Sequence, residues 1–369
     1  MKVNAKRIWL ITDTHFGVRS NSREWMDIIE DFFKNQFIPT LRDNYKPGDI
    51  VIHCGDVFDS RQSINLYVMN KGLDIFEEIA KIAPIYAIVG NHDIFMKYSN
   101  EINSLKVFKH MNNVSIFENP QVIQTPTKRL LLMPWEEDHK AFHEIISKPE
   151  YKADILFCHT DIKGMSFNKF VKIEEGCEPV DFSGYERVYS GHIHYAQQFK
   201  NIRMLGTPYE LTRSDSGNQK GFWMLDLEKD EEKFFPNTRS PKFLRFRLEF
   251  ILEQTMEWLE ETFDNNFVDV TVTPEWSLKF PFSTLAEKVP GFRKINPIIM
   301  TDQDGLSEGE DGQIVEQTSE INLITLIDDY IDSLPYTENV KEGIKKISHK
   351  YYQETLKDLE EKRYENSIN

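Results

Sequence analysis

Residues 50–59 read IVIHCGDVFD, an apolar run that passes directly into a cluster of glycine and acidic residues. A short apolar run bounded in this way is typical of a buried strand. The strand ends in Gly55 and Asp56 instead of ordinary turn residues, so it would present polar groups at the carboxyl end of a sheet. Open α/β sheets bind their ligands at that edge. The segment therefore predicts a layered α/β domain and the position of its functional site.

The sequence around this segment repeats the alternation of apolar runs with helical periodicity. We predict strands at 8–12, 50–54, 85–89, 129–133, 155–158 and 188–190, and antiparallel hairpin strands near 199–205 and 221–227. We predict helices at 22–41, 65–82, 101–111 and 139–146. Strands that alternate with helices are the signature of an α/β domain.

Changes of composition divide the chain into four predicted parts. The α/β domain is expected at residues 1–240, and a small α+β module follows at 241–300. Residues 301–319 are rich in Asp, Glu, Gly and Ser and contain few apolar residues, which predicts an acidic flexible linker. Residues 320–369 are expected to form a pair of amphipathic helices.

Composition also limits the location and the partners of the protein. Hydrophobic residues make up 40% of the chain, charged residues make up 28%, and the formal net charge is −16. This acidity excludes a protein that coats nucleic acid by bulk electrostatics, so any DNA contact must be local. No apolar run approaches the roughly 18 residues of a membrane span, and no signal-peptide pattern opens the sequence. We therefore expect a cytoplasmic protein without membrane contact. Cys54, Cys158 and Cys177 form no CxxC pair, so neither a disulfide framework nor a zinc knuckle is predicted.

Five polar clusters follow the predicted strands. They are Asp13-Thr14-His15, Gly55-Asp56-Val57-Phe58-Asp59, Gly90-Asn91-His92-Asp93, His159 and Gly191-His192-Ile193-His194. Side chains of a strand alternate with period two, so we expect Asp13 with His15, and His192 with His194, each to aim at one point. A single D-x-H or GNHD sequence often occurs by chance. The complete ordered set indicates a catalytic site.

The chemistry of these clusters fits divalent metal ions. Carboxylate, imidazole and amide oxygen ligands suit manganese, iron, zinc or magnesium. The candidate ligands are Asp13, His15, Asp56, Asn91, His159, His192 and His194. This set is too large for one ion and suits two ions with a bridging carboxylate, roughly 3.5 to 4 Å apart, which clamp the attacking and leaving oxygens of a phosphoryl displacement. His92 is then left over, and we predict that it protonates the leaving oxygen or neutralises transition-state charge.

The remaining histidines lack this context. His139 and His143 lie at i, i+4 of a predicted helix, but the residues between them lack the Glu of an HExxH motif, so we expect them to face solvent. His53 is predicted to be a hydrogen-bonded core histidine. The sequence contains no GxxxxGK[ST] loop, so this chain does not hydrolyse ATP by a P-loop.

The ordered set D-x-H, GDxFD, GNHD, a lone His after a strand and GHxH resembles the calcineurin-like metallophosphoesterase superfamily. Within it, the chain resembles the SbcD-type DNA-repair nucleases, most closely the recombination nuclease subunits of T-even bacteriophages. Further similarity lies at Met133-Pro134-Trp135, Leu205-Gly206-Thr207-Pro208 and Gly221-Phe222-Trp223-Met224. The resemblance implies a four-layer fold, in which helices flank a two-sheet β-sandwich, with a small α+β cap and a C-terminal helix pair. For a phage protein, the expected location becomes the cytoplasm of the bacterial host.

The same resemblance implies roles for individual residues. One manganese ion, or magnesium as the alternative, would bind to Asp13, His15, Asp56 and His194, and a second ion to Asp56, Asn91, His159 and His192. His92 would be the catalytic acid. Some relatives carry His at the position of Asp59, so we expect Asp59 to support the ligands from behind, and Asp93 to do the same.

The resemblance also implies partners. Family members pair with an SMC-like coiled-coil ATPase and dimerise through helices of the nuclease domain, here 65–82 and 101–111, which gives a two-plus-two heterotetramer. The module at 241–300 would contact DNA through five cap cations: Lys242, Arg245, Arg247, Arg293 and Lys294. Helices near 320–333 and 337–361 each carry an apolar stripe, which predicts docking on the ATPase. The stripe could instead pack back on the nuclease domain.

The leading functional hypothesis is a metal-dependent DNA nuclease that acts in DNA end processing, recombination and repair. It would be a 3′–5′ exonuclease on duplex ends and an endonuclease on single strands. The alternatives are a protein phosphatase or nucleotide phosphodiesterase of the same superfamily, and a non-catalytic scaffold that binds DNA ends. The cap and the helix pair favour the nuclease, because an enzyme for small substrates has little need of either. The complete ligand set argues against the scaffold.

Overall fold

The computed structural model describes residues 1–169, 171–273, 294–299, 306–308, 314–316, 331 and 340–348. The chain divides into two compact units. The first comprises Met1–Thr301 with Glu310–Gln313, and the second comprises Asp302–Gly309 with Ile314–Asn369. None of the described helices is long and apolar enough to cross a membrane.

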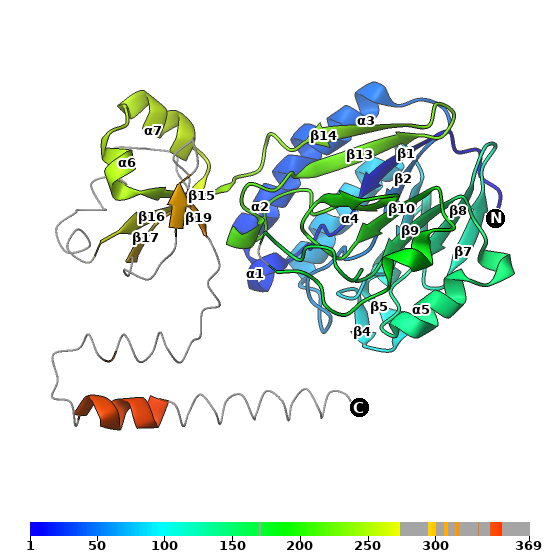
Figure 1. Ribbon diagram of the computed structural model, residues 1–369. Coiled ribbons are helices and arrows are strands. Elements are labelled where there is room, and N and C mark those ends of the chain that lie inside the picture. The colour runs from blue at the N-terminus through cyan, green and yellow to red at the C-terminus, as the bar shows by residue number, and fades with distance from the viewer. Residues whose placement is uncertain are drawn as a thin grey trace. The chain divides into compact units, whose positions relative to one another are not determined.

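Two six-stranded mixed sheets form the centre of the first unit (Figure 1). The first sheet has the order β14 (Glu231–Pro236), β13 (Gly221–Asp226), β1 (Arg7–Ile11), β2 (Asp49–His53), β3 (Ile85–Ile88) and β6 (Val114–Phe117). The second has the order β11 (Gln197–Phe199), β12 (Ile202–Met204), β10 (Arg187–Gly191), β9 (Ile155–His159), β8 (Arg129–Met133) and β7 (Gln121–Gln124). The inner strands of each sheet are parallel, and β13, β14, β7 and β11 are antiparallel additions at the edges.

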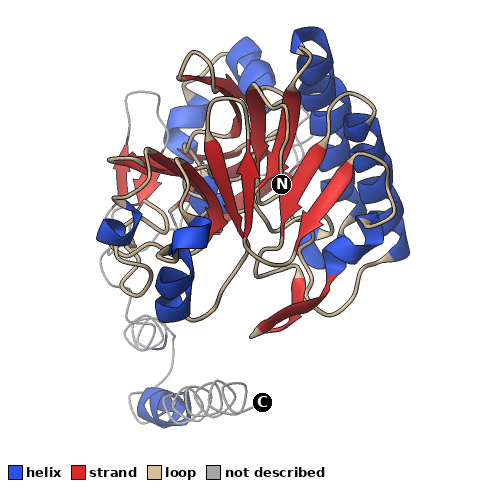
Figure 2. Cartoon of the chain, turned by 90° about the vertical axis from the view of Figure 1, so that its right-hand side faces the viewer, coloured by secondary structure: helices blue, strands red, loops and turns tan. Residues whose placement is uncertain are grey.

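The two sheets pack face to face, with helices on their outer faces (Figure 2). Alternate residues of β1 take opposite sides: Ile8 and Leu10 join Phe157 of the second sheet in one core, whereas Trp9 joins the core under the helices. Strands that are buried on both faces read as continuous apolar runs, which is the pattern that predicted them. The arrangement confirms the predicted four-layer fold class.

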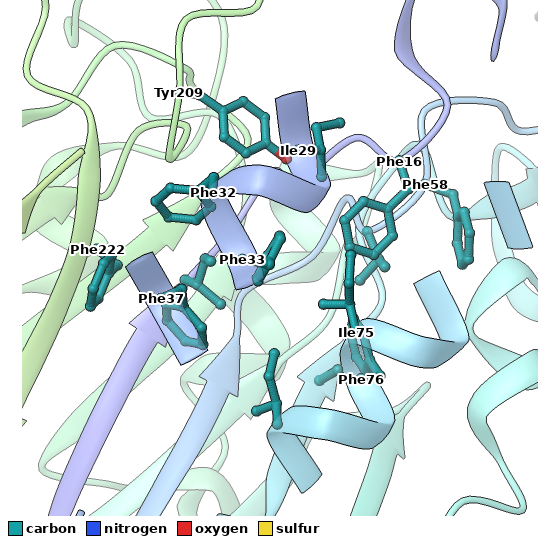
Figure 3. Close-up of a cluster of buried hydrophobic side chains, with 14 of the residues drawn as sticks. Phe16, Ile29, Phe32, Phe33, Phe37, Phe58, Ile75, Phe76, Tyr209 and Phe222 are labelled. Atoms are coloured by element: carbon teal, nitrogen blue, oxygen red, sulfur yellow. The ribbon is translucent and has the colours of Figure 1, made fainter. Parts of the chain in front are cut away.

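Helices α2 (Arg23–Phe32), α3 (Ile38–Asn44) and α4 (Leu66–Ala80) cover the first sheet, and α5 (His139–Ile146) covers the second. The single helix predicted at 22–41 is interrupted by a π-helical turn at Phe33–Phe37. Pro39 lies at the start of α3 and has no N–H to continue the α-helical ladder, which accounts for the wider turn. Figure 3 shows the result: Phe32, Phe33 and Phe37 gather toward Phe222, and the Phe37 and Phe222 ring centroids lie 4.8 Å apart.

The prediction of a helix at 101–111 is wrong over its first residues. β5 (Ser99–Asn103) pairs there with β4 (Ile94–Met96), and only a 3₁₀ turn follows at Ser104–Phe108. The buried side chains of this turn, Leu105 and Phe108, are three residues apart, which suits a 3₁₀ helix. Other short helical turns among the described residues of the first unit are α1 (Val18–Asn21), Pro149–Tyr151, Pro179–Phe182 and Arg213–Asp215.

A small module follows the two-sheet domain and also belongs to the first unit. Its three strands, β15 (Phe243–Arg247), β16 (Phe267–Val272) and β17 (Lys294–Ile299), are parallel, and α6 (Leu248–Leu252) and α7 (Met256–Phe263) connect the first two. The module thus combines helices and strands, as the sequence predicts for 241–300, but its strands are parallel. A helix expected near 283–288 lies outside the described residues.

The second unit is described at three places. In the predicted linker, β18 (Leu306–Glu308) pairs antiparallel with β19 (Ile314–Glu316), so this acidic segment contains a strand pair that the composition did not predict. Ile331 is buried, with 3% of its surface exposed. Residues 340–348 are helical, and Val340 and Ile347 are 46% and 58% exposed.

Candidate metal centre

The predicted ligands come together where strands of both sheets end. Asp13 and His15 follow β1, Asp56 follows β2, and Asn91 follows β3. His159 ends β9, and His192 and His194 follow β10. Among the described residues, three groups could hold a metal ion: Asp13, His15 and His194; Asp56, His159 and His192; and His15, Asp59 and His92. The site therefore lies at the edge that the GDVFD segment predicts.

One group has the spacing of ligands around a single cation. The Oδ1 atom of Asn91 lies 2.9 Å from Nε2 of His159 and 2.9 Å from Nδ1 of His192. Oδ2 of Asp56 lies 3.2 Å from Nε2 of His159. An ion about 2.1 Å from each ligand would hold neighbouring ligand atoms about 3.0 to 3.4 Å apart. These four side chains therefore fit a divalent ion.

The second group has a more open arrangement on the other side of Asp56. Nε2 of His15 lies 3.0 Å from Nε2 of His194 and 4.0 Å from Oδ1 of Asp13. The same His15 nitrogen lies 3.8 Å from Oδ2 of Asp56. Asp56 thus places one oxygen within 4 Å of both groups, as a bridging carboxylate requires.

The prediction that each pair aims at one point holds for Asp13 and His15, which join one group, and is wrong for His192 and His194. Strand alternation is not the cause in the first case. β1 ends at Ile11, so Asp13 and His15 lie beyond the strand, and both have positive φ, 50° and 44°. His192 has φ 82° and turns toward Asn91, whereas His194 turns toward His15. The two histidines therefore join different groups instead of aiming at one point.

Left-handed backbone is concentrated at the candidate ligands. Asp56, with φ 55°, shares this conformation with Asp13, His15 and His192. Such conformations of non-glycine residues cost on the order of 1–3 kcal/mol each and cluster at functional sites. Gly191 permits the close packing here, because a Cβ at this position would lie 2.2 Å from Oγ1 of Thr12.

A network of hydrogen bonds holds the ligand loops. Asp93 is buried and accepts backbone N–H groups of Gly90 and Asp56 at 3.0 and 2.9 Å. Oδ1 of Asp59 lies 3.2 Å from Nδ1 of His15. Nδ1 of His92 is 2.7 Å from the carbonyl oxygen of Asp59. Asp59 and Asp93 therefore lie behind the ligands, in the positions that suit a supporting role.

Two residues beside the centre were missed in the sequence. Oδ1 of Asp161 lies 3.1 Å from Nε2 of His192, so a carboxylate orients the ring whose other nitrogen faces Asn91. Its position two residues after His159 was the available signal. The ring centroids of Trp135 and His192 lie 4.8 Å apart. The resemblance included Trp135 without giving it a role.

Charge and burial shift the pKa values of this cluster strongly. Burial alone would lower the pKa of His159, but Asp56, Asp13 and the carbonyl group of Cys54 together outweigh it and raise this pKa to about 9. Burial opposes ionisation of Asp56, yet His159 holds the pKa of that carboxyl well below its usual range. Burial raises the pKa of Asp13. Buried negative charge therefore attracts cations to this cluster.

His53 is buried and His143 is exposed, as the sequence predicts, whereas His139 is only partly exposed. Burial lowers the pKa of His53 to about 3, and its Nε2 lies 3.1 Å from the Thr14 hydroxyl, as expected of a core histidine. His143 lies on α5 with Nδ1 3.0 Å from Asp181. All three cysteines are free and buried.

Comparison with known proteins agrees with this geometry. Residues 6–196 match the model of the calcineurin-like phosphoesterase family, which is more than half of the chain. The chain belongs to this family. It is therefore a metal-dependent hydrolase of phosphoester bonds.

The relatives of this phosphoesterase include an exonuclease subunit and a DNA repair protein. Exonuclease subunit 1 of Enterobacteria phage T4 is 28% identical over 356 residues, which cover 94% of this chain and 99% of that protein. The DNA double-strand break repair protein Mre11 of Methanosarcina mazei is 25% identical over 264 residues. That alignment covers 62% of this chain and 41% of the Mre11 protein.

Proposed function

We propose that this phosphoesterase is a two-metal DNA nuclease, a 3′–5′ exonuclease on duplex ends and an endonuclease on single strands. The observation that carries the proposal is the pair of ligand groups that share Asp56, with His92 beside them. The similarity to the phage T4 exonuclease subunit along nearly its whole length supports DNA as the substrate. The enzyme would act in DNA end processing, recombination and repair, in the cytoplasm of the host cell.

The proposed first ion would be held by Asp13, His15, Asp56 and His194, and the second by Asp56, Asn91, His159 and His192. Oxygen and imidazole donors without thiolate suit manganese, iron, zinc or magnesium. From the resemblance to the DNA-repair nucleases we propose manganese, with magnesium as the alternative. When bound, such a pair of ions neutralises charge on the phosphoryl group and acidifies water.

His92 is proposed to be the acid that protonates the leaving oxygen. Its Nδ1 lies 2.7 Å from the carbonyl oxygen of Asp59, so Nδ1 carries a proton that it donates to that carbonyl. Nε2 is then the nitrogen that can deliver a proton to the substrate. The backbone N–H of His92 donates to Oδ1 of Asp56 at 2.8 Å, which fixes His92 beside the proposed bridging carboxylate. Asp59 and Asp93 would keep this geometry.

The small module is proposed to bind DNA through the cap cations. Lys242 is exposed, and Arg245 and Arg247 share one face of β15, where both are partly buried. Nη2 of Arg245 lies 3.6 Å from Asp269, which also forms an ion pair with Arg213. Lys294 begins β17, and Arg293 lies outside the described residues. Local positive charge of this kind can bind phosphate although the net charge of the whole chain is negative.

An SMC-like coiled-coil ATPase is proposed as the protein partner, bound by the C-terminal helices. The exposed Val340 and Ile347 of the helical segment 340–348 leave an apolar face available for such docking. Dimerisation through the surface that includes α4 is proposed to complete a two-plus-two heterotetramer. Leu66, at the start of α4, is 72% exposed.

The decisive experiment compares substrates and metals in one matrix. Purified protein is assayed on duplex DNA, single-stranded DNA, a phosphopeptide and bis(p-nitrophenyl) phosphate, each with Mn²⁺, Mg²⁺ or chelator, with and without the ATPase. We expect Mn²⁺-dependent cleavage of both DNA substrates and no release of phosphate from the phosphopeptide. Efficient dephosphorylation of the phosphopeptide without DNA cleavage would show that the enzyme is a phosphatase. Inactivity on all substrates would favour the alternative of a non-catalytic scaffold that binds DNA ends.

A further inference from the structure

Arg61 lies beside the metal centre without an evident structural task. It follows Asp59 by two residues, in the loop that leads to α4, and its side chain is exposed. In the part of the chain that the structure describes, no carboxylate forms an ion pair with it. Its Nη2 atom instead lies 2.9 Å from the side-chain amide of Asn91.

The Asn91 amide can take two orientations, related by a half turn, and each gives Arg61 a different neighbour. In one orientation the amide nitrogen donates to Oδ2 of Asp56 at 3.1 Å, and the amide oxygen accepts from Arg61. In the other, the oxygen points toward His159 and His192, each 2.9 Å away. Only this second orientation lets Asn91 act as a metal ligand, because an amide nitrogen has no lone pair to offer.

In the metal-ligand orientation of Asn91, two hydrogen-bond donors lack an acceptor. This orientation directs the Asn91 amide nitrogen toward Nη2 of Arg61, so two donors face each other at hydrogen-bond distance without an acceptor. Asn91 is 6% exposed, so its side chain has little room to turn away. The guanidinium can move because it is exposed. An oxygen atom that accepts from both donors would satisfy them together.

We infer that Arg61 and the Asn91 amide nitrogen form a two-donor cradle for a non-bridging oxygen of the substrate phosphate. The inference rests on the proposed function only in taking a phosphodiester as the anion. His92 belongs to the same side of the centre, since its Nδ1 bonds to Asp59 in the loop that carries Arg61. The cradle therefore holds the phosphoryl group where the proposed acid can reach the leaving oxygen. Planar guanidinium is well suited to phosphate.

The cradle couples substrate binding to the metal. With the ligand orientation of Asn91, Arg61 is free to bind the anion. With the opposite orientation, its Nη2 is already engaged by the Asn91 oxygen. Arg61 should therefore strengthen phosphate binding in the metal-loaded protein and contribute little when metal is removed.

The test uses full-length Arg61→Gln and Arg61→Lys, with Arg42→Gln as the matched control, because Arg42 is exposed on α3 away from the centre. Binding of inorganic phosphate is measured by calorimetry with Mn²⁺ and with chelator, and KM and kcat are measured on bis(p-nitrophenyl) phosphate. Metal content of each variant is measured by elemental analysis.

We expect Arg61→Gln to retain its metal and to bind phosphate about ten- to a hundredfold more weakly in Mn²⁺, the range of a charge-assisted hydrogen bond. Arg61→Lys should recover part of the loss, Arg42→Gln should match wild type, and the chelated proteins should not differ. Unchanged phosphate affinity in Arg61→Gln would overturn the inference. Loss of Mn²⁺ from that variant would also overturn it, because it would show that Arg61 positions the metal ligand Asn91 and does not act by binding phosphate. Wild type that hydrolyses bis(p-nitrophenyl) phosphate but not DNA would end the nuclease proposal and leave this result standing.

Discussion

Removing the amine of Lys220 should destabilise the fold and loosen the His194 side of the metal centre. Lys220 is 9% exposed, and its Nζ donates to the carbonyl oxygen of His194 at 2.7 Å, to Oγ1 of Thr207 at 2.8 Å and to Oδ1 of Asp215 at 2.9 Å. All three protons of the ammonium are thus used. Lys220→Met keeps the volume of the side chain but leaves the Asp215 carboxylate buried without its cation.

The expected loss is about 3–5 kcal/mol of unfolding free energy, the range observed when one partner of a buried ion pair is removed. Burial raises the pKa of Asp215, but Lys220, His194 and the backbone N–H of Thr212 together outweigh it, so this pKa is lowered in the native protein. A carboxyl with a depressed pKa contributes stability above its ordinary pKa of 3.8 and loses it as the pH falls. The difference between wild type and Lys220→Met should therefore be fully present near neutral pH and shrink as the pH falls below 3.8.

Chemical denaturation at fixed metal concentration measures this effect, since bound ions also stabilise the folded state. Asp215→Asn and the double variant complete a double-mutant cycle. The double variant should cost less than the sum of the two single variants by about 2 kcal/mol, because neither charge is then left unpaired. A loss below about 1 kcal/mol in Lys220→Met, or additive single effects, would refute the reasoning.

Further outcomes follow from the proposed site and partners. His92→Ser should keep two bound ions while turnover falls by about 10²- to 10⁴-fold, and loss of metal would instead make His92 a ligand. Asp56→Asn should weaken both ions together in a metal titration, and loss of one ion alone would contradict the bridging role. Neutralising the five cap cations should lower the salt slope of DNA binding by about one unit for each phosphate that the module no longer binds, and an unchanged slope would place the DNA path elsewhere. Deleting residues 320–369 should abolish co-purification with the ATPase while Mn²⁺-dependent cleavage of short single strands continues, and a truncated protein that still binds the ATPase would exclude this docking role.

The sequence alone predicted the inner strands of both sheets and the residues that gather at the candidate metal centre, but it missed the edge strands β6, β7 and β14. Apolar runs such as 50–54 and 129–133 marked strands correctly, because strands buried on both faces need continuous apolar side chains. Polar residues directly after those runs marked the site, because the ends of parallel strands meet at one edge of a sheet. Asp56 and His159 could therefore be chosen before any contact between them was known.

Only the tertiary structure decided how these residues are combined. His192 and His194 face different ligand groups because His192 takes a left-handed backbone conformation, which period-two alternation does not anticipate. Segment 99–103 became a strand and not a helix because β4 offers it a partner. The amine of Lys220 and the guanidinium of Arg61 reach the site from loops distant from the residues that they contact. Local composition determines which residues prefer a buried strand or a strand end, whereas ligand grouping and charge pairing depend on contacts between segments far apart in the chain.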